Sequence, residues 1–268
     1  MATIGIMDSG VGGLSVFREI LKVLPHERFI YFSDNAYCPY GEKEAALILD
    51  RAREITDWML FRGADIMVIA CNTATAAAIA SLREEYSSPC ERVKVLTGGR
   101  RDHISFIGME PAVKPAALGT RSGVIGVLAT AGTLAGSKYI DMKSQFEDNV
   151  RIVEQVGQGF VELVEKGELS GRNAEEIVRN SVSPLVEAGA DTIVLGCTHY
   201  PFLRDLIALA AGPDIRIIDP APAVAKQLCN IMQKEGLISG NGTDGQPDIT
   251  LKSSGPSDAL ERMFKQIQ

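Results

Sequence analysis

Two stretches of the chain, IMVIACNT at residues 66–73 and TIVLGCTH at residues 192–199, follow the same pattern. Each begins with an apolar, β-branched run, which is typical of a buried parallel strand. A cysteine then stands at the expected carboxyl end of the strand, directly before a segment with helical character. Ligands of open α/β sheets bind at this edge, and a helix N-terminus there lowers the pKa of a thiol. The duplication therefore predicts one site that uses two matched thiols, Cys71 and Cys197.

The composition is that of a globular protein: 268 residues with 46% hydrophobic content are enough for two ordinary domains. A formal net charge of −7 and a pI near 5.1 argue against a nucleic-acid surface, which needs clustered basic residues. The basic pair at residues 100–101 is too small to change this view. We expect a cytoplasmic protein without membrane association, because the chain shows neither a signal sequence nor an apolar run of roughly 20 residues.

The five cysteines are an odd number and include no close pair of the kind that binds zinc or cycles as a dithiol. We therefore expect neither disulfides nor a structural metal site. Cys38, Cys90 and Cys229 are interpreted as small, buried hydrophobic residues.

Strand-like and helix-like segments alternate almost throughout, which predicts an α/β protein with mostly parallel sheets and helices on both faces. The expected strands cover residues 3–7, 29–32, 65–70, 104–108, 123–128, 150–156, 192–195 and 215–220. The expected helices cover residues 13–24, 44–61, 113–118, 135–146, 160–166, 174–188 and 223–234, with an alanine-rich helix ending near residue 86.

The segment at residues 87–103 breaks this alternation with proline, a Gly-Gly pair and mixed charges, so we expect a long surface loop with little structure of its own. The predicted second domain covers residues 104–211. Since the first 103 residues offer only three or four strands, residues 212–268 are expected to return and complete the first domain. Within them, residues 236–247 are expected to form a flexible loop before a final strand and helix.

The segment DSGVGG at residues 8–13 follows the first expected strand and opens the first expected helix. Its backbone N–H groups could bind an anion, or its glycines could serve only a tight turn. It matches a dinucleotide loop in part: Ser15 stands where the third glycine belongs, although Asp34 has a suitable spacing for a ribose contact. Asp8 ends its strand beside Cys71, where it could direct a proton or cap the helix.

His199 follows Cys197 by two residues and could shuttle a proton, cap a helix or make a hydrogen bond in the core. Its pairing with a cysteine favours the proton shuttle. Together with Asn72, Thr73 and Thr198, it places hydrogen-bond donors at two helix starts. Such donors suit a small ligand that carries carboxylates.

Several motifs together closely resemble the bacterial glutamate racemases. They are DSGVGGL at residues 8–14, PYGEK at 39–43, ACNTA at 70–74, EPAVKP at 110–115 and GCTHYP at 196–201. They extend over most of the chain in the family's order. As a set they distinguish this chain from the related aspartate racemases better than the cysteines do.

The resemblance implies an enzyme that interconverts L- and D-glutamate without a cofactor and supplies D-glutamate for peptidoglycan. Racemisation removes the α-proton from one face of Cα and returns a proton to the other, which requires two acid/base groups on opposite sides of the substrate. By resemblance, Cys71 with Asp8 works on D-glutamate, and Cys197 with His199 works on L-glutamate. The implied fold has two similar α/β domains that face each other across the active site.

The resemblance also implies substrate contacts and assembly. Thr130 and Thr133 correspond to contacts of the substrate's side-chain carboxylate, and Glu165 to an acidic residue near the second cysteine. A homodimer is expected, with glutamate as the ligand and no nucleic acid, membrane or metal. The remaining implied substrate contacts are Ser9, Pro39, Tyr40, Gly41, Asn72, Thr73 and Thr198.

Two features depart from the family pattern. Cys38 lies in a segment where many relatives carry Thr and Arg, which leaves a third thiol near the pocket without a role. The segment at residues 87–103 is longer than usual. Three alternatives remain: a racemase for aspartate or another amino acid, a protein that binds DNA gyrase, and a nicotinamide-dependent dehydrogenase, which would leave the duplicated cysteines unexplained.

Overall fold

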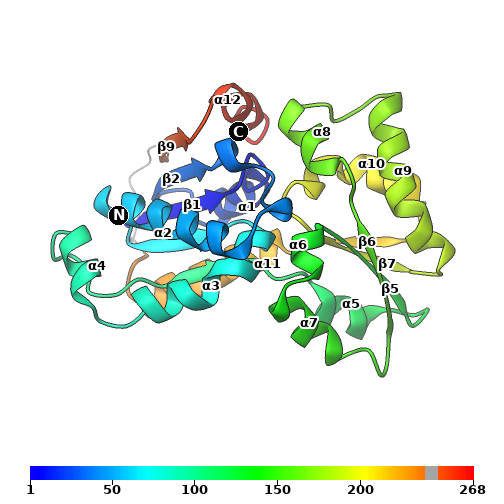
Figure 1. Cartoon of the computed structure of the whole chain (residues 1–268), viewed down its shortest axis with the longest axis horizontal. Coiled ribbons are helices and arrows are strands. Elements are labelled where there is room, and N and C mark those ends of the chain that lie inside the picture. The colour runs from blue at the N-terminus through cyan, green and yellow to red at the C-terminus, as the bar shows by residue number, and fades with distance from the viewer. Residues whose placement is uncertain (239–246) are drawn as a thin grey trace.

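The first of two parallel sheets takes strands from both the N-terminal and the C-terminal parts of the chain. The computed structural model describes residues 1–238 and 247–268, so most of the predicted loop at 236–247 lies outside the described residues. Five strands are ordered β4-β3-β1-β2-β9, and every neighbouring pair is parallel. Figure 1 shows β9 beside the N-terminal strands. The strands are β1 (Thr3–Asp8), β2 (Arg28–Ser33), β3 (Ile66–Ile69), β4 (Phe106–Gly108) and β9 (Asp248–Ser253).

The second sheet has four strands, ordered β6-β5-β7-β8, and is also parallel. Its strands are β5 (Val124–Ala129), β6 (Arg151–Val156), β7 (Thr192–Gly196) and β8 (Arg216–Ile218). The α/β fold class with two parallel sheets flanked by helices is therefore confirmed.

Helices cover the first sheet on both sides, because successive side chains of a strand point to opposite faces. Along β1, Ile4 and Ile6 join the core with α1 and α11, whereas Met7 joins the core with α2 and α3. The helices are α1 (Leu14–Val23), α2 (Ala45–Phe61), α3 (Asn72–Tyr86), α4 (Glu91–Leu96), α5 (Val113–Gly119), α6 (Ala131–Leu134), α7 (Ser137–Ser144), α8 (Phe160–Lys166), α9 (Arg172–Glu187), α10 (Arg204–Ala211), α11 (Ala221–Lys234) and α12 (Asp258–Phe264), with short 3₁₀ helices η1 (Asn35–Tyr37), η2 (Tyr40–Glu42) and η3 (Tyr200–Leu203). None of the helices in the described part of the chain is long and apolar enough to span a membrane.

The predicted domain boundaries at residues 103/104 and 211/212 are wrong. Strand β4 pairs with β3, with Met67 opposite Phe106, so residues up to 108 belong to the first sheet. Strand β8 pairs with β7, with Ile193 opposite Ile217, so the second sheet extends to residue 218. The chain therefore crosses between the sheets near residues 109–112 and 219–220. Beyond residue 220, β9 pairs with β2, α11 packs against α1, and Phe264 of α12 stacks on Phe17 of α1.

The segment at residues 87–103 is folded, so the prediction of a loop with little structure is also wrong. Helix α4 lies within it and buries Val93 completely. The backbone N–H of Cys90 donates to the Asp102 carbonyl at 2.8 Å, and the Thr97 hydroxyl donates to the Val93 carbonyl at 2.8 Å. These bonds close the segment on itself.

Candidate active site

The carboxyl ends of both sheets contribute to one small cavity between the domains. Asp8 ends β1, Cys71 follows β3, Thr130 follows β5 and Cys197 follows β7. The cavity measures about 20 Å³, which is room for about one water molecule. Its lining contains eleven of the predicted site residues and one that sequence reasoning missed, Val161 of α8. The lining residues are Ser9, Pro39, Tyr40, Gly41, Cys71, Asn72, Thr73, Thr130, Val161, Cys197, Thr198 and His199.

Cys71 is held at the start of α3, on the side of the first domain. Its Sγ accepts the backbone N–H of Ala74 at 3.4 Å and lies 3.7 Å from the Ser9 hydroxyl. Burial, together with the charge of Asp8, raises the pKa of this thiol, although the Ala74 N–H opposes the change. The helix start thus acts in the expected direction, but burial outweighs it, so the pKa of Cys71 lies above its usual value. The thiol needs a neighbouring proton acceptor to become a nucleophilic base.

Asp8, whose charge acts on the Cys71 thiol, offers a carboxylate as such an acceptor. It is fully buried. One oxygen, Oδ2, accepts the backbone N–H groups of Gly13 at 2.7 Å and Gly10 at 3.3 Å. The other oxygen, Oδ1, has no hydrogen-bond partner in the described part of the chain. Burial raises the pKa of Asp8 to about 6. Oδ2 thus binds the loop that leads into α1, whereas the proton-transfer role of Asp8 stays a prediction.

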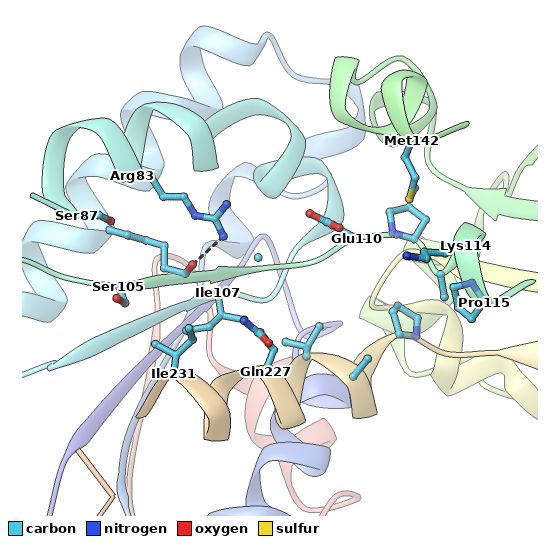
Figure 2. Close-up of a pocket in the computed structure, with 17 residues that line it drawn as sticks. Arg83, Ser87, Ser105, Ile107, Glu110, Lys114, Pro115, Met142, Gln227 and Ile231 are labelled. Atoms are coloured by element: carbon cyan, nitrogen blue, oxygen red, sulfur yellow. Dashed lines mark hydrogen bonds between the residues drawn. The ribbon is translucent and has the colours of Figure 1, made fainter. Parts of the chain in front are cut away.

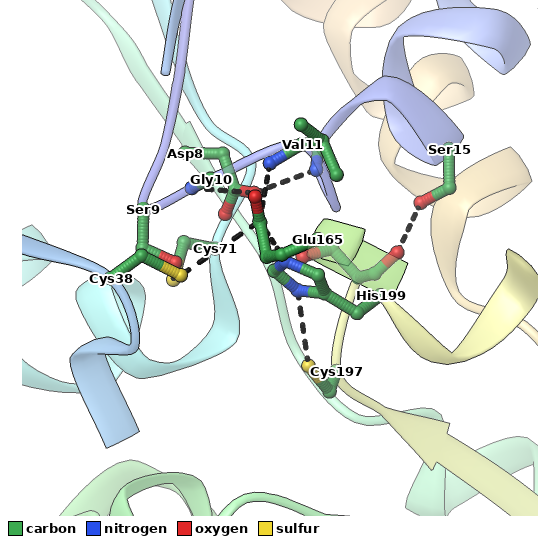
Figure 3. Close-up of polar contacts among 12 residues, drawn as sticks. Asp8, Ser9, Gly10, Val11, Ser15, Cys38, Cys71, Glu165, Cys197 and His199 are labelled. Atoms are coloured by element: carbon green, nitrogen blue, oxygen red, sulfur yellow. Dashed lines mark hydrogen bonds and ion pairs between the residues drawn. The ribbon is translucent and has the colours of Figure 1, made fainter. Parts of the chain in front are cut away.

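Cys197 has a different partner on the side of the second domain. Its Sγ lies 3.7 Å from His199 Nδ1, and His199 Nε2 lies 2.7 Å from Glu165 Oε1 (Figure 3). Burial alone lowers the pKa of His199, but its hydrogen bonds with Cys197 and Glu165 raise the pKa well above its usual value. The arrangement favours an imidazolium between a carboxylate and a potential thiolate.

Glu165 also connects this side to the first domain, because its Oε1 accepts the backbone N–H of Val11 at 2.8 Å. A Cβ at Gly10 would lie 1.9 Å from that same oxygen, and a Cβ at Gly12 would lie 2.3 Å from His199 Nδ1. The glycines of the first loop are therefore needed for the close approach of the second domain. This explains their spacing without a bound nucleotide.

Three threonine hydroxyls form a polar cluster across the domain boundary. Thr73 Oγ1 lies 3.0 Å from Thr130 Oγ1 and 3.5 Å from Thr133 Oγ1, and the last two lie 3.0 Å apart. Beside them, both amide atoms of Asn72 are buried without a hydrogen-bond partner in the described part of the chain. Hydroxyl and amide donors in such a place can bind a carboxylate.

Tyr40 is fixed from outside the cavity. Its hydroxyl donates to Asp34 Oδ2 at 2.5 Å, and Arg51 donates to both oxygens of Asp34, at 2.8 and 3.0 Å. Both oxygens of the Asp34 carboxylate are thus hydrogen-bonded within the chain. This argues against the ribose contact that its spacing suggested.

Two larger cavities lie beside the crossings between the two sheets. One of about 650 Å³ is lined by Arg83, Glu110, Lys114 and Gln227, among others (Figure 2). Another of about 380 Å³ lies between α3 and α7 and includes Asn72 and Thr133 in its lining. Since Asn72 also lines the cavity of the thiols, its side chain stands at the wall between the two spaces.

Known proteins resemble the chain over almost its full length. Glutamate racemase of Pseudomonas putida strain W619 is 46% identical, over 98% of this chain and 92% of its own. That of Methylococcus capsulatus is 44% identical, over 97% and 89%. The crystal structure of glutamate racemase isoform RacE1 from Bacillus anthracis matches with a TM-score of 0.82 at 29% identity, over 99% of this chain and 93% of its own.

Escherichia coli glutamate racemase, solved in complex with L-glutamate and the activator UDP-MurNAc-ala, also matches with a TM-score of 0.82, at 28% identity, over 99% of this chain and 95% of its own. The profile of the Asp/Glu/Hydantoin racemase family matches residues 4–228. Most of the chain, including both cysteine motifs, lies within that match. The chain therefore belongs to the Asp/Glu/hydantoin racemase family.

Proposed function

We propose that this chain interconverts L- and D-glutamate in the cytoplasm and supplies D-glutamate for peptidoglycan. The relatives named glutamate racemase support the substrate. One structural observation carries the mechanism: two thiols from different domains line the same cavity, and each has its own ionisable neighbours. This is the arrangement that proton removal on one face and return on the other requires.

In the proposed reaction from L-glutamate, the Cys197 thiolate takes the α-proton from one face of Cα. The Cys71 thiol gives its proton to the opposite face, which forms D-glutamate and leaves Cys71 as a thiolate. The reverse direction begins from that thiolate. The imidazolium of His199 stabilises the thiolate form of Cys197, and the free oxygen of Asp8 receives or returns the proton of Cys71. These steps use only groups of this chain, so the proposal invokes no cofactor.

Substrate binding uses the remaining polar groups of the cavity. The threonine cluster is proposed to bind the side-chain carboxylate. The α-carboxylate and the amine are assigned to the loop around Ser9, to Asn72 and to Thr198. Enclosure of the substrate strengthens these interactions, because a cavity without bulk water has a low effective dielectric constant.

Exchange of the α-proton in D₂O tests the proposal when L- and D-glutamate are followed separately by NMR and circular dichroism. Cys71→Ser and Cys197→Ser should each lower racemisation by about 1,000-fold or more. Cys71→Ser should keep its slow residual exchange for L-glutamate, and Cys197→Ser should keep it for D-glutamate. Cys90→Ser, which alters a thiol outside the cavity, should behave like the wild type.

Full racemase activity in either site variant would remove that cysteine from the mechanism. If the wild type turned over aspartate but not glutamate, the proposed substrate would be wrong, while the proposed two-thiol chemistry would stand.

We also propose a homodimer, as the resemblance implies. Light scattering at micromolar protein should give twice the chain mass, and a monomer mass would contradict this assembly.

A further inference from the structure

The third thiol, Cys38, lies close to two side chains of types that bind metals, a glutamate and a histidine that are distant from it in the sequence. Cys38 Sγ lies 3.8 Å from Glu165 Oε1, the same oxygen that contacts His199 Nε2. One ligand atom from each of these residues lies within 4.8 Å of the other two. Figure 3 shows the three side chains beside the catalytic cysteines.

We propose that Cys38, Glu165 and His199 form an inhibitory binding site for Zn²⁺. Thiolate, carboxylate and imidazole are the ligands that zinc prefers, and three protein ligands leave the fourth tetrahedral position for water. The residues come from separate parts of the chain and from both domains. The absence of a closely spaced pair therefore could not exclude this site.

The distances need only small changes to accept the ion. Tetrahedral zinc holds a sulfur and an oxygen ligand about 3.5 Å apart, and a nitrogen and an oxygen ligand about 3.3 Å apart. The observed sulfur–oxygen distance of 3.8 Å is close to the first value. The observed nitrogen–oxygen distance of 2.7 Å must widen, which rotation of the Glu165 side chain can supply. The Glu165 side chain is 19% exposed, which makes it the side from which the ion would enter.

Zinc bound there would stop the racemisation. This consequence rests on the proposed function. The ion would replace the proton on His199 Nε2 and the proton on Cys38 Sγ, and both protons would leave to solvent. A zinc-bound imidazole keeps a proton only on Nδ1, so the imidazolium that supports the Cys197 thiolate could not form. The ion would also connect the two domains through Cys38 and Glu165, which would hinder opening of the cavity.

The test compares wild type, Cys38→Ser and Cys90→Ser under reducing, thiol-free conditions. Co²⁺ serves as a spectroscopic probe, because a thiolate ligand gives it a near-ultraviolet charge-transfer band. We expect this band at one equivalent in wild type and Cys90→Ser and its absence in Cys38→Ser. Cys90 is a suitable control because its thiol lies 3.6 Å from the Glu85 carbonyl, outside the cavity.

Zn²⁺ titration of racemase activity gives the second readout. We expect inhibition of wild type and Cys90→Ser that EDTA reverses, and a half-inhibiting concentration at least about 10-fold higher for Cys38→Ser. Cys38→Ala serves as a second variant if circular dichroism shows that Cys38→Ser does not fold. Equal inhibition of the Cys38 variants, or cobalt binding without loss of activity, would overturn the proposal. Because the absorption band does not depend on turnover, it tests the metal site even if the proposed function fails.

Discussion

At the scale of single residues, the site contains ionisable side chains whose charged forms are disfavoured by burial. Asp8 is fully buried, and its pKa is raised to about 6. A carboxyl group whose pKa is higher in the folded than in the unfolded protein destabilises the fold as the pH rises from about 4 to about 6. Above that range the carboxylate is ionised and can serve the proposed proton transfer. The cost in stability is thus a consequence of burying a carboxylate whose charge acts on Cys71.

The substitution Asp8→Asn should therefore raise the stability of the protein and lower its activity. The variant should be more stable than wild type at neutral pH by about 2 kcal/mol, because its neutral side chain needs no ionisation in the interior. It should lose racemase activity by about 100-fold or more. For the wild type, kcat/KM should fall as the pH is lowered through about 6. Urea unfolding and pH–rate profiles check these effects. If kcat/KM of Asp8→Asn still falls at low pH as in the wild type, that fall belongs to another group.

A second prediction concerns Glu165, which positions His199. Glu165→Gln should lower the pKa of His199, because the carboxylate is one of the groups that raise it. Racemisation should fall by about 100-fold, equally in both directions for kcat/KM, because the two enantiomers have the same free energy. With only three histidines in the chain, NMR titration can follow the His199 ring directly. An unchanged His199 pKa in Glu165→Gln would contradict this role. Glu165→Asp, which keeps the carboxylate, should restore part of the racemase activity.

The sequence predicted some site residues for a physical reason and others only by resemblance. Asp8 ends an apolar strand, Cys71 and Cys197 each follow one, and the ends of parallel strands meet at one edge. Glu165 lies in a helix and Thr133 lies in a turn of α6, where no local pattern distinguishes them from surface residues. Val161 was missed because nothing in the sequence distinguishes its apolar side chain from that of an ordinary core residue. The raised pKa of Cys71 was also beyond prediction, since it depends on the depth of burial.

At the scale of elements, alternation of strands and helices could be predicted, but the pairing of strands could not. The periodicity of β4 and β8 identified both as strands, yet each pairs with a strand of a different sheet from the one expected. Pairing is decided by contacts between residues far apart in the chain, which local patterns do not encode. Helix α4 was missed because a six-residue helix flanked by proline and a Gly-Gly pair resembles a loop.

Helix α4 offers a matched test of whether the segment at residues 87–103 belongs to the cooperative fold. Val93 is completely buried, whereas Val95 of the same helix is 69% exposed. Val93→Ala should destabilise the protein by about 2 kcal/mol through lost burial and the resulting cavity. Val95→Ala should change stability by less than about 0.5 kcal/mol. Urea unfolding measures both, and equal effects would show that α4 does not pack against the core.

At the scale of the whole molecule, the structure is closed around its site. The cavity of about 20 Å³ has room for about one water molecule, whereas glutamate has roughly ten non-hydrogen atoms. In the described part of the chain, the domains are connected by two crossings, near residues 109–112 and 219–220, and contacts such as the threonine cluster join them across the site. We therefore expect the domains to separate when the substrate enters.

A disulfide across the cavity should stop turnover by preventing this motion. A Cβ built on Gly41 lies 3.3 Å from the Cβ of Thr130, just under the usual separation of about 3.5–4.5 Å in disulfides. The oxidised double variant Gly41→Cys/Thr130→Cys should lose at least about 100-fold in racemase activity relative to its own reduced form, and dithiothreitol should restore it. This comparison removes the effect of the substitutions themselves. Wild type and the single variants, treated with the same oxidant, control for reaction of the native thiols, and a free-thiol count establishes the bond. Equal activity of the oxidised and reduced double variant would show that glutamate enters and leaves without separation of Gly41 from Thr130.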